Sequence, residues 1–544
     1  MDTIGVVLAM LAVVVVSGAL ARTMPLPVPT PLVQIALGGA LALLSRHPVP
    51  LEPDIFFLLF LPPLLFLDGW RIPNEDLLRD KVTILELALG LVFFTVIGMG
   101  YFIHWMIPVM PLPIAFALAA ILSPTDPVAV SAITARIGVP RRLLHVLEGE
   151  SLLNDASGLV CLRFAVAAAL TGSFTLPVAA LTFLRLAAAG VVIGVGLTAA
   201  VMFIVHAVSS RIGEDASSEV LISLLVPFGA YLVAEHAGGS GILAAVSAGI
   251  TMSYIELFGK ALAITRMQRN VVWNTVQFAL NGIVFVLLGE QLPSILLQAM
   301  TTVRQAEHTN PAWIAIYVLA IVLGLAALRF IWVWTSFHLS AFARRARGEP
   351  IIRRANARLV AAVSVAGVRG AVTMAAVLTL PLTLRGGAPF AARDLAILLA
   401  AGTIVASLVG AWLVLPRLLR GLEVPAEAAL EQGADRARVA AAEAAIRAIE
   451  SLTAKAADPD ESELRAQVAA RIIDLYRRRI AGRAQSGESA ARIRRADAIE
   501  RGLRLAGLRA ERDKIFELAR AQALSDATAR QLVRSIDLLE ERLS

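Results

Sequence analysis

The stretch that decides the fold is Glu148-Gly149-Glu150-Ser151-Leu152-Leu153-Asn154-Asp155, which places acidic residues inside an apolar segment. The sequence from about residue 143 to residue 170 is long and apolar enough to predict a membrane-spanning helix. An ionised carboxylate at mid-bilayer costs about 2.5–3.5 kcal/mol on insertion scales, so such residues are expected to face the interior of a helix bundle. Ser151 and Asp155 are four residues apart and share one helix face. This face therefore offers a cation a hydroxyl and a carboxylate, with Glu150 and Asn154 on the neighbouring edge.

A purely structural role is an alternative for the two acids of this stretch. Either carboxylate can belong to an interhelical salt bridge that only holds a bundle together. Glu150 fits that reading better than Asp155, because Asp155 follows the neutral amide of Asn154 and looks less like one half of a charge pair. The sequence therefore favours Asp155 as the functional carboxylate.

The composition divides the chain into a membrane domain and a polar tail. Of the 544 residues, 58% are hydrophobic and the mean hydropathy is +0.74, which excludes an ordinary soluble protein. Residues 421–544 carry 22 basic and 21 acidic side chains, nearly half of all the charges. We therefore predict a membrane domain over residues 1–420 and a helical cytoplasmic domain over residues 421–544. The second domain is either a solvated helical bundle or a regulatory or dimer-contacting domain. Balanced charge argues against nucleic-acid binding by this tail.

Windows of about 20 apolar residues predict thirteen membrane spans. They cover residues 3–21, 28–45, 53–69, 83–107, 112–136, 143–170, 177–208, 217–236, 238–256, 271–292, 312–340, 358–381 and 393–416. Seventeen Lys and Arg residues fall on one set of alternate loops and four on the other. Because basic loops stay in the cytoplasm, the N-terminus is expected outside and the C-terminus inside.

Two of these spans are interrupted by residues that break helices. The fifth contains Ser123-Pro124-Thr125-Asp126-Pro127, and the twelfth contains Gly367-Val368-Arg369-Gly370. Proline should end the first half of span five, and Thr125 or Asp126 can cap a half-helix that begins at Pro127. The two breaks lie at matching places if spans 1–6 and 8–13 form inverted repeats, which points to a transport site. Ordinary kinks are the alternative, but kinks do not usually carry Asp and Arg.

Five motifs resemble those of the sodium/proton exchanger family, the first monovalent cation:proton antiporter family, and in particular its bacterial branch. They fall in the family's order within residues 1–420 and leave the tail uncovered. They are LPPLLFLDGW over 61–70, SPTDP over 123–127, ESLLND over 150–155, ALNGIVFVLLG over 279–289 and GVRGA over 367–371.

The resemblance implies an all-α polytopic membrane fold and a set of site residues. The fold would be a homodimer of thirteen-helix chains, each with a core domain and a dimerisation domain, in which spans five and twelve cross at their unwound centres. Asp155 would bind the cation or the proton. Asn154 would sit where electrogenic relatives carry a second acid. The residues completing a sodium site with Asp155 would be Thr125, Asp126 and Ser151.

The resemblance also implies structural roles for charged residues around the site. Glu150 would form an ion pair with Arg329 of span eleven, and Arg369 would lie at the helix crossing, where it can offset the charge of Asp126. Asp68 would help to form an entrance funnel, or it simply caps span three.

One residue departs from the family pattern, and two further acids lie near the ends of predicted spans. Arg163 lies two turns after Asp155, and both pairing with an acid and extension toward the membrane surface are open to it. Glu235 and Glu290 fall near predicted span ends and are expected to contact water.

Together these features predict an electroneutral sodium (or lithium)/proton antiporter of the inner plasma membrane, serving pH and sodium homeostasis by alternating access. A potassium/proton antiporter is the alternative, since the same oxygen donors suit either cation. An enzyme is disfavoured because Ser151 has no histidine at helical spacing, and a channel is disfavoured by the broken helices. The single Cys161 excludes an internal disulfide and a cysteine metal site. No cofactor is expected, and the partners are the cation, the proton, the lipid bilayer and a second copy of the chain.

Overall fold

The computed structural model describes most of the chain, and all regular secondary structure in the described residues is helical. The described residues are 3–24, 28–44, 53–71, 85–126, 130, 141–171, 176–258, 263–305, 312–346, 357–381, 390, 392–420, 426–454, 459–484 and 488–543. The chain divides into two compact units, Met1–Glu423 and Val424–Ser544, which are described separately.

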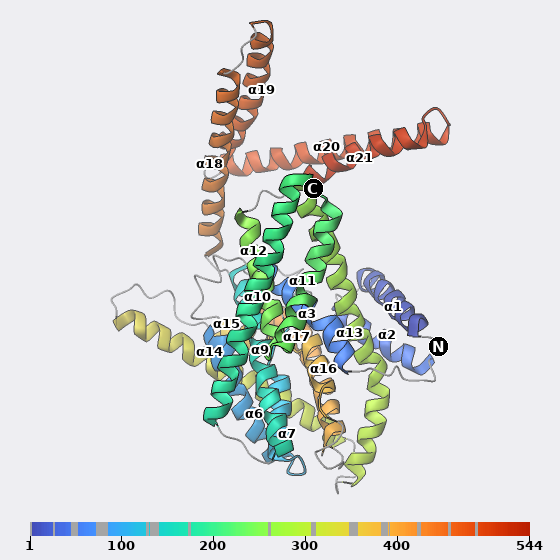
Figure 1. The fold of residues 1–544 in the computed structure, drawn as a ribbon, viewed down its shortest axis with the longest axis vertical. Coiled ribbons are helices and arrows are strands. Elements are labelled where there is room, and N and C mark those ends of the chain that lie inside the picture. Colours follow the sequence, from blue (N-terminus) through green and yellow to red (C-terminus); the bar gives the residue numbers. More distant parts are fainter. Residues whose placement is uncertain are drawn as a thin grey trace. The chain divides into compact units, whose positions relative to one another are not determined.

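The first unit contains the apolar helices (Figure 1). They are α1 (Thr3–Thr23), α2 (Thr30–Leu44), α3 (Pro53–Arg71), the π-helix η1 (Glu86–Leu91) that continues as α6 (Val92–Met106), α7 (Leu112–Leu122), α9 (Arg141–Thr171), α10 (Leu176–Ile212), α11 (Ala216–His236), α12 (Gly241–Phe258), α13 (Ala263–Gln305), α14 (Ala312–Ala346), α15 (Ala357–Val365), α16 (Ala371–Leu378) and α17 (Arg393–Leu419). By length and composition, six helical stretches of the described residues can cross a membrane, and shorter apolar helices accompany them. The count of thirteen spans stays a prediction.

One set of helices, here called the first helix group, consists of α1, α2, α3, α11, α12 and α13, and α10 packs on α11 and α12. Its core includes Phe66 and Trp273, whose rings stack with centroids 5.3 Å apart. α2 and α13 approach so closely that a Cβ atom on Gly38 would meet the carbonyl oxygen of Val286. Small residues permit such close packing between membrane helices, where dispersion contacts rather than water exclusion hold helices together.

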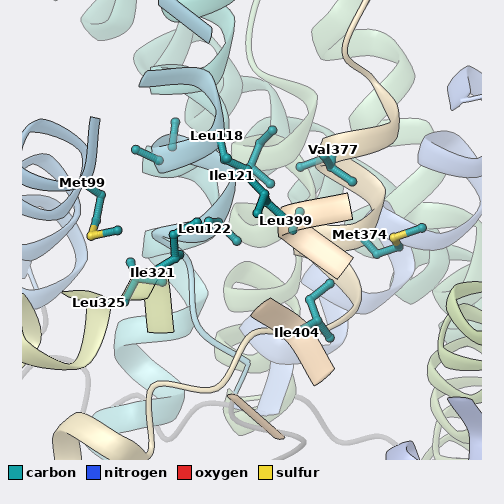
Figure 2. Close-up of a cluster of buried hydrophobic side chains, with 14 of the residues drawn as sticks. Met99, Leu118, Ile121, Leu122, Ile321, Leu325, Met374, Val377, Leu399 and Ile404 are labelled. Carbon is teal, nitrogen blue, oxygen red and sulfur yellow. The ribbon is translucent and has the colours of Figure 1, made fainter. Parts of the chain in front are cut away.

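The second helix group consists of η1, α6, α7, α9, α14, α15, α16 and α17. Figure 2 shows apolar side chains from several of these helices converging on one buried cluster. They include Met99, Leu118, Ile121, Ile321, Met374 and Leu399. The two groups meet where α3, α12 and α13 contact α9, α16 and α17, and this contact zone is called the seam.

Both predicted helix breaks are present in the second helix group. α7 ends at Leu122, and residues 123–126 are not helical. α15 ends at Val365 and α16 begins at Ala371, with non-helical backbone between them. The two unwound segments touch, because the backbone N–H of Asp126 donates to the carbonyl of Val368 at 2.7 Å. The half-helix predicted to begin at Pro127 lies outside the described residues.

The prediction that Glu290 lies near a span end and contacts water is wrong. The span predicted over 271–292 belongs to α13, which extends further in both directions, over Ala263–Gln305. Glu290 therefore lies inside a long helix and not at its end, and its side chain is only 2% exposed. It is buried where α13 packs closely on α2.

The second unit consists of α18 (Ala426–Ala454), α19 (Pro459–Ala484), α20 (Glu488–Arg520) and α21 (Asp526–Leu543). α18 packs on α19, and α20 packs on α21, where Arg512 donates to Glu540 at 2.5 Å (Figure 1). α19 begins directly at Pro459. A further turn over 521–525 was not predicted. A regulatory role for this unit stays a prediction.

Candidate functional site

A cavity of about 30 Å³ lies at the seam and brings together most of the residues predicted to bind the ion. This volume has room for one or two water-sized ligands. Its polar lining is Asp68, Thr125, Asp126, Ser151, Asp155, Gln277, Asn281 and Thr373. The cavity wall therefore combines α3 and α13 of the first helix group with α9, α16 and residues of both unwound segments of the second group.

Asp155 and Ser151 project from α9 into this cavity, one turn apart as predicted, and both side chains are buried. Ser151 Oγ donates a hydrogen bond of 2.8 Å to the carbonyl oxygen of Thr125. A side chain of α9 thus hydrogen-bonds a carbonyl of the unwound segment. The lone pairs of the Ser151 hydroxyl stay available, so carboxylate and hydroxyl oxygens line one wall.

Asn154 lies beside Thr125 and does not line the cavity. Its Nδ2 donates to Thr125 Oγ1 at 3.0 Å, and Thr125 Oγ1 in turn donates to Glu150 Oε1 at 3.4 Å. Among the described residues, Asn154 Oδ1 has no hydrogen-bond partner although it is buried. The predicted binding residues thus divide into cavity-lining groups and this supporting amide.

Glu150 and Arg329 form a buried, bidentate ion pair between α9 and α14. Arg329 Nη1 and Nη2 donate to the two carboxylate oxygens at 2.5 Å each, and Nε donates to the carbonyl of Val363 at 3.0 Å. Both side chains are less than 5% exposed. Such planar pairing supplies geometric specificity as well as charge neutralisation. It joins α9 to α14 and to the end of α15, directly behind the cavity.

Arg369 lies at the crossing of the broken helices, as predicted, but its hydrogen bonds go to backbone carbonyls. Nε donates to the carbonyl of Leu122 at 2.8 Å, and Nη1 donates to the carbonyl of Gly367. Leu122 is the last residue of α7, so the guanidinium compensates the negative end of that half-helix. Its backbone N–H donates to Ser407 Oγ of α17 at 3.2 Å. Arg369 thereby ties the crossing to two helices.

Gly370 is required by the position of Asp126. A Cβ atom built on Gly370 falls on the Asp126 carboxylate, so a side chain here must displace that acid from the cavity wall. Overpacking of this kind typically costs about 1–3 kcal/mol. We expect Gly370→Ala to lower cation-driven proton transport strongly, measured as initial rate per amount of inserted protein.

Gly410→Ala is the matched control for this substitution. Gly410 lies on α17 in the same unit, and a Cβ atom there meets nothing within 4 Å. This variant should transport like the wild type. Equal rates for the two variants would contradict the close fit of Asp126 against Gly370.

Sequence reasoning missed the wall that α13 contributes. Gln277 and Asn281 are four residues apart, share a helix face and line the cavity. Arg71, the last residue of α3, donates to Gln277 Oε1 at 2.5 Å and to Asn274 Oδ1. The available signal was a set of amides at helical spacing inside an apolar span, namely Asn274, Gln277 and Asn281. Thr373 of α16, also on the wall, carried no such signal.

The donor set is made of oxygen atoms. Within the described residues, no group of three or more His, Cys, Asp or Glu side chains is placed to hold a metal ion. Carboxylate, hydroxyl, amide and carbonyl oxygens suit a hard cation, and unwound backbone at helix breaks suits its passage.

Comparisons with known proteins agree with this architecture. The sequence profile described as "Sodium/hydrogen exchanger, transmembrane" matches residues 9–421. The chain is 38% identical to the Escherichia coli (strain K12) protein "Uncharacterized Na(+)/H(+) exchanger YjcE", over 100% of this chain and 99% of that protein. It is 43% identical to the "Sodium, potassium, lithium and rubidium/H(+) antiporter" of Bacillus pumilus (strain SAFR-032), over 76% of this chain and 60% of that protein. The fold resembles that of the sodium proton antiporter MjNhaP1 from Methanocaldococcus jannaschii, with a TM-score of 0.56 at 17% identity over 77% of this chain and 98% of that one.

Proposed function

The chain belongs to the sodium/hydrogen exchanger family, and we propose that it is an electroneutral sodium (or lithium)/proton antiporter that works by alternating access. One observation supports the proposal: buried Asp155, Ser151 and the unwound segment over 123–126 line the same cavity at the helix crossing. A membrane transporter needs a polar site of this kind near the helix breaks. Membership of an exchanger family also supports a transporter and not an enzyme.

Exchange follows from competition for one carboxylate. A buried, ionised and unoccupied Asp155 is costly, whereas binding either a proton or a cation neutralises it. Ser151, Asp126 and Thr125 offer further oxygen atoms to the cation. If the two helix groups slide past each other only when Asp155 is occupied, one ion must return for each ion that leaves. Asp68 and Gln277 would form the funnel on one side of the site.

The neutral Asn154 beside Asp155 implies that each cycle exchanges one proton for one monovalent cation. Transport in proteoliposomes should then be independent of membrane potential. The measurement compares initial rates of sodium-driven proton movement with the potential clamped at zero and at about 100 mV, which would bias a net charge movement by about 2.3 kcal/mol. Electroneutral exchange would be contradicted by a transport rate that rises or falls with the applied potential, as expected when net charge crosses the membrane.

The choice of cation is tested by adding sodium, lithium and potassium in turn to proteoliposomes containing a pH-sensitive dye. Proton movement driven by sodium and lithium supports the proposal. Movement driven by potassium alone would favour the potassium/proton alternative, which the name of the Bacillus pumilus relative keeps open. No response to any cation from folded, inserted protein would contradict antiport altogether.

The remaining features of the proposed antiporter concern its assembly and placement. We propose thirteen spans in two inverted repeats, a homodimer, and an inner plasma membrane location with the N-terminus outside and the C-terminus in the cytoplasm. The matched breaks at Pro124 and Gly367 support the repeats. The excess of Lys and Arg on one set of predicted loops supports the orientation. In that membrane the exchange would serve pH and sodium homeostasis.

A further inference from the structure

The ends of the helices in the first helix group can be assigned from their polar contacts. Trp70 Nε1, at the end of α3, donates to Glu256 Oε2 of α12 at 2.7 Å. Arg269, near the start of α13, forms ion pairs with Glu256 and, at 3.3 Å, with Glu219 at the start of α11. These contacts bring the end of α3 and the start of α11 together on one side of the unit, called the α3 end.

A polar route leads from Asp155 toward the α3 end. Asp68 and Gln277 line the cavity with Asp155, and Gln277 accepts a hydrogen bond from Arg71, which is exposed at the last residue of α3. In the other direction along α9 the packing is apolar, since Leu159 and Leu162 are at most 5% exposed. In this conformation the site therefore faces the α3 end and is sealed on the opposite side.

Arg163 lies beyond this seal. It is eight residues after Asp155, about 12 Å further along α9. Its Nη2 contacts Glu235 Oε1 at 3.0 Å, which settles the alternatives left open for this arginine. Glu235 is sixteen residues after Glu219 on α11, about 24 Å from the α3 end. The same Glu235 oxygen accepts the backbone N–H of Gly241 at 3.1 Å, so it is held in place by the start of α12.

The Arg163–Glu235 ion pair joins the two helix groups, since α9 belongs to the second group and α11 to the first. Both helices would have to separate on this side for the site to face the other way. We propose that Arg163 and Glu235 are positioning residues whose ion pair favours the conformation that faces the α3 end, and so sets the difference in apparent cation affinity between the two sides of the membrane. This inference rests on alternating access in the proposed function.

The size of the bias follows from the exposure of the pair. The two side chains are 48% and 31% exposed, and exposed ion pairs typically shift an equilibrium by about 1.4- to 5-fold. Either Arg163→Gln or Glu235→Gln removes the pair completely. The double variant should therefore behave like each single variant.

The test uses a thiol reporter in the cavity. Leu64, a buried cavity residue of α3, is changed to Cys in the full chain with Cys161→Ala, and silver ion, a thiol-reactive monovalent cation, is applied as the label from each side of sealed vesicles. Thiols left unlabelled are then counted with a maleimide after denaturation. We expect the parent to be labelled rapidly from one side and slowly from the other, and the slow rate to rise by up to about 1.4- to 5-fold in both single variants and in the double variant. Arg504→Gln is the matched control, since it removes a comparably exposed ion pair in the second unit.

Each outcome of the labelling experiment decides the proposal. An unchanged rate, multiplying effects in the double variant, or no labelling of the parent from either side would overturn it. Labelling does not require transport. A protein that shows the expected labelling shift but moves no protons would retain the positioning role and contradict the proposed antiport instead.

Discussion

Asp155→Asn is expected to reduce cation-driven proton transport to the level of liposomes without protein. Asparagine has nearly the same shape, but it cannot take up the exchanged proton and lacks the negative charge that a cation needs. The proton and the cation then no longer compete for this side chain, and exchange stops. The remaining polar groups of the cavity wall are neutral apart from Asp68 and Asp126. Dye-reported transport with sodium, lithium and potassium, at matched amounts of inserted protein, measures the effect.

Asp394→Asn is the control for this substitution. It makes the same chemical change at the start of α17, where the carboxylate is 47% exposed and lies 3.9 Å from Arg393. It should transport like the wild type. Residual sodium-driven transport in Asp155→Asn well above the level of empty liposomes would mean that another group carries the proton.

Arg329→Met is expected to destabilise the first unit by about 3–5 kcal/mol, because it leaves the Glu150 carboxylate buried without its cation. The loss also removes the hydrogen bond from Arg329 to the carbonyl of Val363 at the end of α15. Equilibrium unfolding of the purified protein in mild detergent, by titration with a denaturing detergent, compares the free energies of unfolding.

A double-mutant cycle separates the ion pair from other effects of the substitution. Glu150→Gln removes the charge that Arg329→Met strands, so the double variant should be more stable than Arg329→Met alone. Additive losses in the cycle would show that the two side chains do not stabilise each other. Loss of transport without loss of stability in Arg329→Met would indicate a direct role in transport.

The helix breaks were predictable from local chemistry, whereas the pairing of distant side chains was not. Pro124 and the glycines at 367 and 370 interrupt helices for reasons contained in their own covalent structure. The contact of Glu150 with Arg329 joins residues 179 positions apart, and only resemblance to a family suggested it. Arg369 illustrates the same limit, because its carbonyl partners depend on how two broken helices cross.

Helix ends and isolated polar residues account for most of what sequence reasoning missed. Hydropathy windows report where a segment is apolar and not where its helix ends, so Glu290 was placed at a boundary that α13 does not have. Gln277 and Asn281 are neutral and few, and their role in the cavity wall depends on which face α13 turns to the seam. The turn after α20 contains no Gly or Pro, and Gln522 adopts a φ of 55° there.

The most direct test of one carboxylate shared by sodium and protons is to count the protons released when sodium binds. Isothermal titration calorimetry of the purified protein in buffers of different ionisation enthalpy gives this number over a series of pH values. The account predicts release that approaches one proton per sodium at pH values where Asp155 starts protonated, and no sodium binding in Asp155→Asn. Sodium binding without proton release at every pH at which the protein is folded would contradict it.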